Sequence, residues 1–277
     1  MIISVNKGGV ANRLKCWASV IRISNNNNYK IKWDVLDDYN ENPHILNCSF
    51  NKLFKNDVEI KSFSELDDIN INEFRVNPEF FIKDSDNLPN NFNNFTSNCR
   101  RTFRCRDKFK RDIDYMFNKI PKKIKYDYIN CFKKIKLIDE LQNQVNEFSK
   151  RFNDKTVSIH IRSWNRNGEI SRRHSLYNVE KFENEMDNYK ECNFFMSTDS
   201  QEVKDYFITE SRFKNNIIFY NRKTSLDNSR DFPEGIQEDV IDLYLLSKNK
   251  IIIGSHFSTF TEVAWYLACC PRTIKIL

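Results

Sequence analysis

The chain has 277 residues, which is long enough for two α/β domains of ordinary size. Its 44 basic and 38 acidic residues leave a net charge of +6, which favours anionic ligands but lacks the density of a dedicated nucleic-acid binder. The eight cysteines contain no CxxC pair, which argues against a zinc ribbon or a thioredoxin-like motif. We expect a cytoplasmic protein of a reducing compartment, without a leader peptide or a transmembrane segment.

The first half of the sequence starts with a clear pattern and then weakens. Apolar spacing predicts a strand over residues 1–5, a helix over 12–23 and a strand over 29–35. Beyond residue 40 the expected elements are short strands or isolated helices, namely strands at 58–60, 73–76 and 80–82 and helices at 107–117 and 136–152.

The second half alternates regularly between strands and helices. The expected strands cover residues 156–161, 194–197, 217–220, 251–254 and 273–276. The expected helices cover residues 179–189, 201–209, 236–247 and 259–269. This alternation is typical of a mostly parallel sheet covered on both faces. The regularity resets near Asn153, so we expect an N-terminal domain over residues 1–153 and a C-terminal domain over 154–277.

In such folds ligands bind beyond the carboxyl ends of the strands, so the turns that follow strands are the first places to search. The first turn holds Gly8 and Gly9, which allow close backbone approach to a ligand, and Asn12 opens the next helix. The spacing matches neither the dinucleotide fingerprint G-x-G-x-x-G nor a Walker A loop. A purely structural turn is the alternative.

His160 and Arg162 lie two apart on a predicted strand, so both side chains project to one face. Arg162 falls at the strand end, where its guanidinium group is suited to clamp a diphosphate. A salt bridge to the other domain is the alternative for Arg162. A buried, hydrogen-bonded core histidine is the alternative for His160.

Two acidic residues, Asp199 and Asp242, are further candidates for contact with a ligand. Asp199 and Ser200 immediately precede a predicted helix, which favours an N-cap role and does not exclude a ligand contact. Asp242 is a lone carboxylate among apolar residues and needs a partner if it is buried. The partner of a buried Asp242 would be a helix terminus or the edge of guanine that carries hydrogen-bond donors. The alternative is that Asp242 faces solvent on an amphipathic helix.

The apolar run that ends at Gly254 leads into a hydroxyl-rich turn and a helix. Ser255, Ser258 and Thr259 lie there. A buried strand feeding a helix N-terminus in this way is an anion site, and phosphate is the expected guest. The metal motifs HExxH and the EF-hand loop are absent, so we predict no metal and no cofactor. The basic, Phe-containing segment 99–111 would suit an anionic acceptor or nucleic acid, but a solvated face is the preferred interpretation.

Four segments, in this order, resemble the GDP-fucose-dependent fucosyltransferase superfamily, which includes the nodulation α1,6-fucosyltransferase and the protein O-fucosyltransferases. They read GGVANRLKCWASVIR (8–22), SIHIR (158–162), FFMSTDS (194–200) and DLYLLSKNKIIIGSHFSTFTEVA (242–264). The resemblance implies a GT-B fold, with two Rossmann-like domains facing across a cleft. It also implies inverting, metal-independent transfer from a GDP-sugar to a glycan or protein hydroxyl, with no nucleic-acid partner.

The resemblance also implies residue roles in the C-terminal domain. Arg162 would hold the β-phosphate and stabilise the leaving GDP, while His160 and Asp242 would contact guanosine. Asp199 is taken as a further donor-binding candidate. The turn and helix start would bind the phosphates through Ser258, Thr259 and Phe260.

Other roles fall on residues elsewhere in the sequence. Gly8, Gly9 and Asn12 would approach the phosphate and sugar from the N-terminal domain, and Asn12 is grouped with Arg162 as catalytic. Glu169, just past the Arg162 turn, is the candidate base, with an exposed loop acid as the alternative.

The sequence departs from the family pattern directly after Arg162. Ser163 and Asn165 stand where the family has a second arginine and an acid. L-Fucose is the leading donor sugar, and another GDP-deoxyhexose is the alternative. The same departure motivates a second hypothesis, a non-catalytic sugar- or nucleotide-binding module on this fold.

Overall fold

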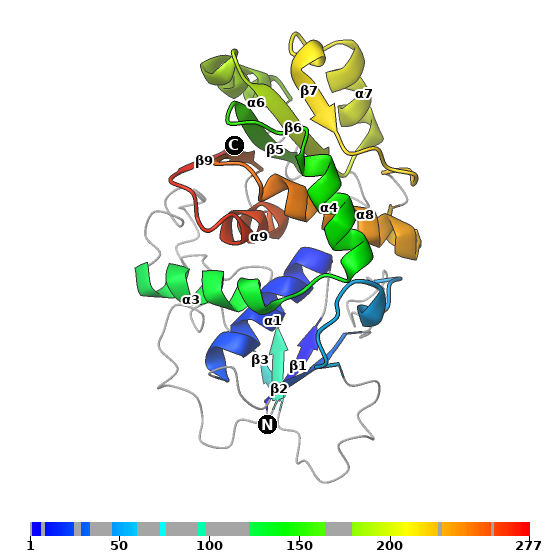
Figure 1. Cartoon of the computed structure of the whole chain (residues 1–277), viewed down its shortest axis with the longest axis vertical. Helices are drawn as coiled ribbons and strands as arrows, with labels where there is room; N and C mark the ends of the chain where they lie inside the picture. The colour runs from blue at the N-terminus through cyan, green and yellow to red at the C-terminus, as the bar shows by residue number, and fades with distance from the viewer. Residues whose placement is uncertain are drawn as a thin grey trace. The chain divides into compact units, whose positions relative to one another are not determined.

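The computed structural model of the chain consists of two compact units, Met1–Ile138 and Asp139–Leu277, and each is described by itself (Figure 1). The structure describes residues 2–6, 9–24, 29–33, 46–59, 73–75, 94–97, 122–163, 179–226, 229–255 and 258–277. Several sequence predictions lie outside these ranges, namely those on Gly8, Asn165, Glu169, the strand at 80–82, the helix at 107–117 and the basic segment 99–111.

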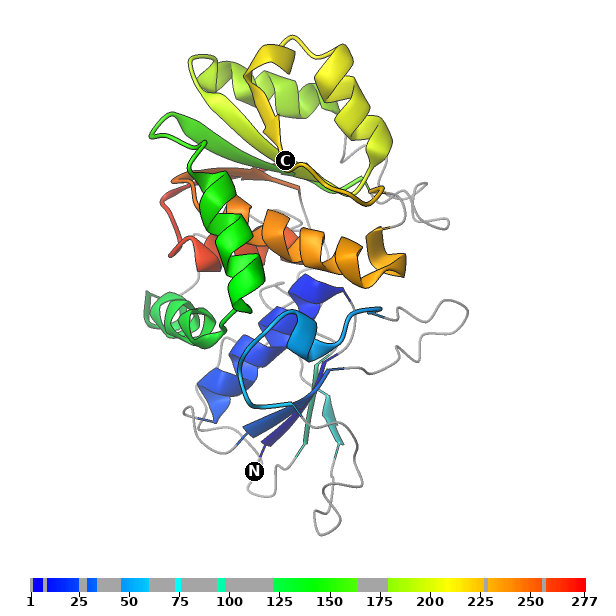
Figure 2. The ribbon, with the colours of Figure 1, turned by 45° about the vertical axis from the view of Figure 1, so that its right-hand side comes forward.

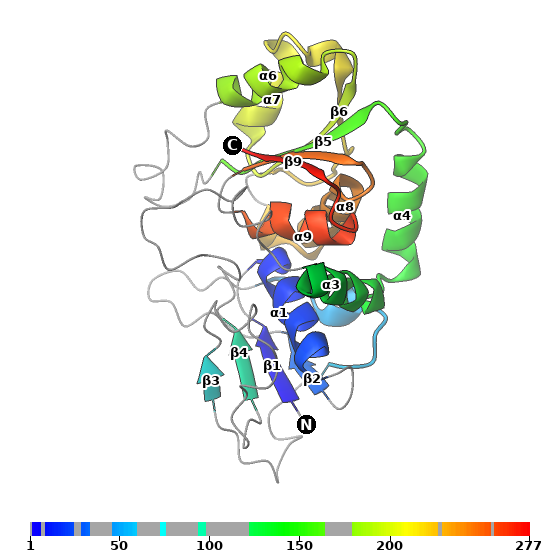
Figure 3. The same cartoon turned by 90° about the vertical axis from the view of Figure 1, so that its left-hand side faces the viewer.

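Unit 1 contains a four-stranded parallel sheet in the order β2-β1-β4-β3. Its strands are β1 (Ile2–Asn6), β2 (Tyr29–Lys32), β3 (Glu73–Arg75) and β4 (Asn94–Ser97). Its helices are α1 (Val10–Ile23), α3 (Lys122–Lys134) and a short 3₁₀ turn, η1 (Phe50–Lys52). Figure 3 shows α1 lying along the sheet with α3 beside it.

The core of unit 1 is aromatic. Trp17 of α1 lies with its ring centroid 5.3 Å from those of both Phe50 and Phe54, and Trp33 after β2 packs on the same two rings. All four side chains are buried. Tilted and edge-to-face aromatic pairs of this kind add stability beyond the area they bury. The apolar face of α1 that the sequence spacing predicted therefore contributes Trp17 to this cluster.

Unit 2 contains a five-stranded parallel sheet in the order β7-β6-β5-β8-β9. The strands are β5 (Thr156–Ile161), β6 (Asn193–Thr198), β7 (Ile217–Phe219), β8 (Ile251–Gly254) and β9 (Thr273–Ile276). Counted along unit 2, the order is third, second, first, fourth, fifth. The direction of winding therefore reverses between β5 and β8, and open α/β sheets bind ligands beyond the carboxyl ends of the strands at such a switch point.

Helices cover both faces of this sheet (Figure 2). One face carries α6 (Val179–Met186) and α7 (Gln201–Thr209), and the other carries α8 (Pro233–Leu246) and α9 (Thr259–Leu267). Alternate residues of β5 serve the two faces, as the pleat requires. Ile159 belongs to the apolar cluster that contains Phe182 of α6 and Phe207 of α7. Ser158 and His160 instead bond to α8 and α9.

The boundary between the units falls one helix earlier than the expected division at Asn153. Helix α4 (Asp139–Ser149) packs with α8 in unit 2. Phe148 lies 5.3 Å from the Tyr220 ring, and the Tyr220 hydroxyl donates to Gln144 Oε1 at 2.8 Å. The helix leads into β5 and buries its apolar stripe against the second unit, so it belongs there. None of the described helices is both long and apolar enough to cross a bilayer.

Candidate functional site

The switch point between β5 and β8 is tied together by Ser255, the residue that follows β8. Its hydroxyl oxygen accepts from the Arg162 backbone N–H at 2.8 Å, and its own N–H donates to the His160 carbonyl at 3.0 Å. A Cβ on Gly254 would overlap the Thr261 side chain, so only glycine permits α9 to approach the strand end so closely. The beginning of α9 is therefore fixed at the carboxyl edge of the sheet.

His160 joins β5 to the first turn of α9. Its Nδ1 lies 2.8 Å from the Thr261 hydroxyl and 3.4 Å from that of Ser258, and its ring stacks on Phe260 at 4.9 Å. Burial lowers the pKa of His160 to about 3; Asp199 opposes this shift and Arg162 adds to it. The imidazole is therefore neutral near pH 7, as in a hydrogen-bonded core histidine. Its predicted contact with guanosine stays a prediction.

The hydroxyl of Ser258 caps α9. It accepts from the Thr261 N–H at 3.4 Å, and Thr259 is the first residue of the helix. The Ser258 side chain therefore serves the helix end, while the backbone N–H groups of the first turn carry the positive end of the helix dipole. These are the groups that the sequence assigns to phosphate.

Arg162 and Asp199 form an ion pair at the carboxyl edge, beyond β5 and β6. The Arg162 Nη1 lies 2.8 Å from Asp199 Oδ2, and Asp199 Oδ1 accepts from the Ser163 N–H at 2.7 Å and its hydroxyl at 3.1 Å. Burial alone would raise the pKa of Asp199, but Arg162 and the Ser163 N–H together hold that pKa below its usual value. Asp199 thus orients the Arg162 turn.

The N-cap role predicted for Asp199 or Ser200 falls to Ser200. Ser200 accepts from the Val203 N–H at 3.3 Å and caps α7. The acid that pairs with Arg162 belongs to the same unit. Whether Asp199 touches a donor stays a prediction.

Asp242 of α8 has a buried partner that the sequence did not reveal. Arg222, whose side chain is 4% exposed, donates to Asp242 Oδ2 at 2.9 Å and to Asp239 Oδ1 at 2.8 Å, and its Nε lies 3.5 Å from Glu238. Burial raises the pKa of Asp242 to about 7; Arg222 opposes the shift, and Asp239 and Glu238 add to it. Oδ1 of Asp242 is buried and accepts no hydrogen bond from the described residues.

Glu238 holds the loop after β7 in place. Its carboxylate accepts from the N–H groups of Lys223 at 2.6 Å and Thr224 at 3.2 Å, and from the Thr224 hydroxyl. These bonds pair the loop backbone with α8 and leave Arg222 pointing inward. The conformation of this loop is therefore determined by its hydrogen bonds to the Glu238 carboxylate rather than by a turn motif in its own sequence.

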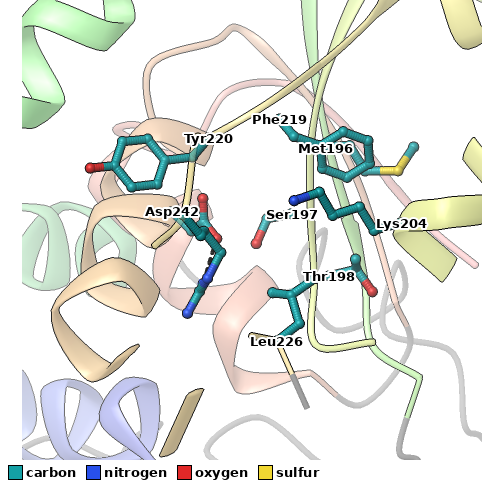
Figure 4. Close-up of a pocket in the computed structure, with 9 residues that line it drawn as sticks. Met196, Ser197, Thr198, Lys204, Phe219, Tyr220, Leu226 and Asp242 are labelled. Carbon is teal, nitrogen blue, oxygen red and sulfur yellow. Dashed lines mark hydrogen bonds and ion pairs between the residues drawn. The ribbon is translucent and has the colours of Figure 1, made fainter. Parts of the chain in front are cut away.

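A pocket opens at the carboxyl ends of β6 and β7 (Figure 4). It combines aromatic, hydroxyl, basic and acidic groups, from Met196, Ser197, Thr198, Lys204, Phe219, Tyr220, Arg222, Leu226 and Asp242. Lys204 and Asp242 enter it from opposite sides. Polar and charged side chains therefore line much of this pocket.

The structure brings most of the predicted donor residues to this edge of unit 2. His160, Arg162, Asp199 and the first turn of α9 meet at the switch point, and Asp242 lies in the pocket at the neighbouring strand ends. Arg222, Glu238 and Lys204 were not assigned roles from the sequence, and Ser255 was named only as a member of the hydroxyl-rich turn. Arg222 could have been found from its position, because it lies three residues beyond the end of β7, where ligand-binding turns are expected.

Gly9 and Asn12 lie in unit 1. Gly9 is the N-cap of α1; among the described residues no side-chain hydrogen bond caps that helix end, and no atom lies within 4 Å of a Cβ built on Gly9. Asn12 lies in the first turn, and its buried Oδ1 has no hydrogen-bond partner within the described part of the chain. The predicted contact of this helix end with phosphate and sugar stays a prediction.

Metal-ligating side chains do not gather within the described ranges. No group of three or more histidine, cysteine, aspartate or glutamate side chains there is arranged to hold a metal ion. The positive groups of the described site that could meet a diphosphate include the Arg162 guanidinium and the positive end of α9.

His160 should leave a signature in the pH dependence of folding. Its folded pKa of about 3 lies below its unfolded value of 6.5, so its contribution to stability is complete above pH 6.5 and is lost as pH falls towards 3. Asp242 acts in the opposite sense, since its pKa is raised to about 7. We expect His160→Gln to flatten the acid side of the profile by up to roughly 1.4 kcal/mol per pH unit relative to the wild type.

The measurement is denaturant unfolding of both proteins from about pH 7.5 to about pH 4.5. The difference at pH 7.5 gives the packing cost of the substitution alone, because neither His160 nor glutamine is charged there. Profiles that stay parallel throughout would contradict the assignment of a neutral, buried imidazole.

The two parallel sheets, the switch point and the ion-paired arginine beside a helix N-terminus define the class of the protein as an α/β fold of the GT-B type. A search of solved structures confirms this class, with GDP-fucose fucosyltransferases as neighbours. No family model matches the sequence, and no curated protein matches it.

The particular neighbours include NodZ α-1,6-fucosyltransferase from Bradyrhizobium, solved with GDP-fucose at 17% identity and a TM-score of 0.57, covering 96% of this chain and 91% of that chain. POFUT1 with GDP is similar at 9% identity and a TM-score of 0.55, covering 99% and 97%. Arabidopsis thaliana FUT1 with GDP has 12% identity and a TM-score of 0.56, covering 99% and 69%. The expected resemblance is thus confirmed at the level of the fold.

Proposed function

We propose that this chain is a glycosyltransferase that moves L-fucose from GDP-fucose to a hydroxyl group of a glycan or protein, with inversion and without a metal. The observation that carries the proposal is the meeting of Arg162, the beginning of α9 and the Asp242 pocket at one edge of the unit 2 sheet. Solved neighbours with the same fold hold GDP or GDP-fucose.

In the proposed reaction, Arg162 takes up the negative charge that develops on the departing diphosphate. Asp199 fixes the guanidinium group at 2.8 Å, so no reorganisation is needed when that charge appears. The N–H groups of Thr259 and Phe260 at the start of α9 supply the second source of positive potential. Ser255 and His160 keep these two parts in register.

The guanosine is assigned to the pocket at β6 and β7, with Asp242 accepting from the ring. The approach of phosphate and sugar from unit 1 is assigned to Gly8, Gly9 and Asn12, and the base to Glu169. A cytoplasmic, reducing location is part of the proposal. The acceptor side is assigned to unit 1.

A second candidate is a binding module that holds the nucleotide sugar without transferring it. The observation that favours this candidate concerns Ser163, which stands where the family has a second arginine. Its N–H and hydroxyl both donate to Asp199 Oδ1. Position 163 would then offer the diphosphate no second guanidinium group beside that of Arg162. Binding of GDP-fucose without release of GDP would favour this candidate.

The experiment is a thermal-shift panel of GDP, UDP, ADP and CMP with and without EDTA, followed by release of GDP from GDP-fucose. A ligand present at 100 times its dissociation constant stabilises the native state by about 2.7 kcal/mol. We expect a shift with GDP alone among the four nucleotides, unaffected by EDTA. A shift with UDP instead would remove the guanine and fucose assignments, and loss of the shift in EDTA would remove the metal-free mechanism.

A further inference from the structure

Lys204 carries an ammonium group to which the proposed mechanism gives no role. It is a half-buried residue of α7, and its Nζ lies 5.6 Å from the centre of the Phe219 ring at the pocket wall. Its helical neighbour Asp205 accepts instead from Gln201 Nε2 at 2.8 Å. No carboxylate in the described ranges pairs with the ammonium. A lysine brought into a partly dry pocket gains from an acceptor on a ligand.

The opposite wall of the pocket presents an acceptor. Asp242 uses Oδ2 for Arg222, and its Oδ1 is buried without a hydrogen-bond donor among the described residues. Arg222 is itself held by Asp239 and the Gly235 carbonyl, at 2.8 and 3.1 Å, so it cannot turn to satisfy both oxygens. Figure 4 shows this carboxylate and the lysine on opposite sides of the cavity.

The pair therefore fits a flat ring with donors on one edge and acceptors on another. Guanine has N1–H and N2–H₂ donors on one edge and the O6 and N7 acceptors on the next. Adenine carries an amino group in place of O6 and an unprotonated N1, so it would direct a donor towards the ammonium and a lone pair towards the carboxylate. Both mismatches leave buried polar groups unpaired, which is a strong basis for discrimination.

We infer that Lys204 is a specificity-determining residue that donates to O6 and N7 of the guanine ring, while Asp242 accepts from the adjacent edge that carries N1–H and N2–H₂. The inference rests on the proposed function, because it requires a guanine nucleotide in this pocket. It goes further by dividing the selection between two side chains from different elements, α7 and α8. The Phe219 ring beneath the ammonium keeps the lysine extended across the cavity.

The test uses Lys204→Met in the full chain, with dissociation constants measured for GDP, IDP and ADP. IDP keeps O6, N7 and N1–H and lacks only the 2-amino group. We expect the substitution to weaken GDP and IDP equally, by about tenfold or more, and to weaken ADP much less, because adenine keeps N7 but carries an amino group in place of O6. Asp242→Asn should instead weaken GDP more than IDP. Lys204→Arg, which keeps a donor, should retain most of the preference for GDP.

Lys250→Met is the matched control, because Lys250 is an exposed lysine of the same unit, paired only with Asp154 among the described residues at 3.2 Å. It should leave all three constants unchanged. An equal loss of GDP, IDP and ADP in Lys204→Met would overturn the inference and place the lysine on the phosphates, and no loss at all would also overturn it. A wild type that does not prefer GDP to ADP would instead remove the proposed function.

Discussion

Replacing Arg162 with alanine should lower the rate of GDP release from GDP-fucose by roughly 100- to 1,000-fold. The guanidinium group stands at the end of β5, paired with Asp199 at 2.8 Å and tied through its backbone N–H to Ser255. Fixed positive charge next to a leaving diphosphate acts mainly in the transition state, so kcat should fall more than donor affinity. The measurement is steady-state turnover together with the dissociation constant of GDP.

The substitution also leaves Asp199 without its cation, so the fold must be checked. Arg151→Ala is the matched control, since Arg151 is an exposed arginine of the same unit that packs over Phe148 before β5. It should leave turnover unchanged. Normal turnover in Arg162→Ala would sink the assigned role. Equal loss in both variants would indicate a general effect on unit 2.

Replacing Arg222 with methionine should lower the free energy of unfolding by roughly 3–5 kcal/mol. Arg222 is the cation shared by Glu238, Asp239 and Asp242, and its side chain is 4% exposed. Its removal leaves three acids together at a buried site, with Arg230 as a further charge acting on Asp239. The loss should be larger at pH 8 than at pH 6, because the acids take up protons as pH falls and the repulsion between them is relieved.

Denaturant unfolding at both pH values measures this effect. Arg212→Met is the control, because Arg212 pairs with Glu183 and Asp187 and its side chain is 47% exposed. It should cost much less. Adding Asp242→Asn to Arg222→Met should recover part of the stability, since it removes one uncompensated charge. A loss below about 1 kcal/mol in Arg222→Met would show that the acids are not held by this arginine.

The second half of the chain was predictable because its signals are local. Apolar runs of four to six residues end at Gly254 or in polar turns, and every expected strand and helix there appears within a few residues of its predicted bounds. In the first half, β4 and α3 were not predicted. Helix α3 reads KKIKYDYINCFKK, where lysines occupy much of the surface and the apolar stripe is narrow. Its position comes from packing on α1.

Site residues could be predicted where the position of one residue in the sequence is informative by itself. They could not be predicted where the site depends on a pair of residues far apart in the sequence. Arg162 and Asp242 stood out by position and by context. Their partners Asp199 and Arg222 are fixed by tertiary structure, across 37 and 20 positions of sequence. The loop at Lys223 and Thr224 has no strong turn motif, and its shape follows from the Glu238 carboxylate. Such pairs become visible only when the strand order is known.

The order of strands in unit 2 also bears on how the site comes into existence during folding. Pairs β6–β7 and β8–β9 join segments close in sequence, such as Phe194 with Ile217 and Ile252 with Ile274, whereas β5–β8 joins Ser158 with Ile252. Closing the longer loop costs more chain entropy and slows the pairing. The hydrogen bonds of Ser255 to His160 and Arg162 connect the ends of β5 and β8, and they therefore form only after these two strands have paired. We therefore expect the proposed nucleotide site to be the last part of unit 2 to assemble, and binding of a nucleotide would then report that the whole sheet has closed.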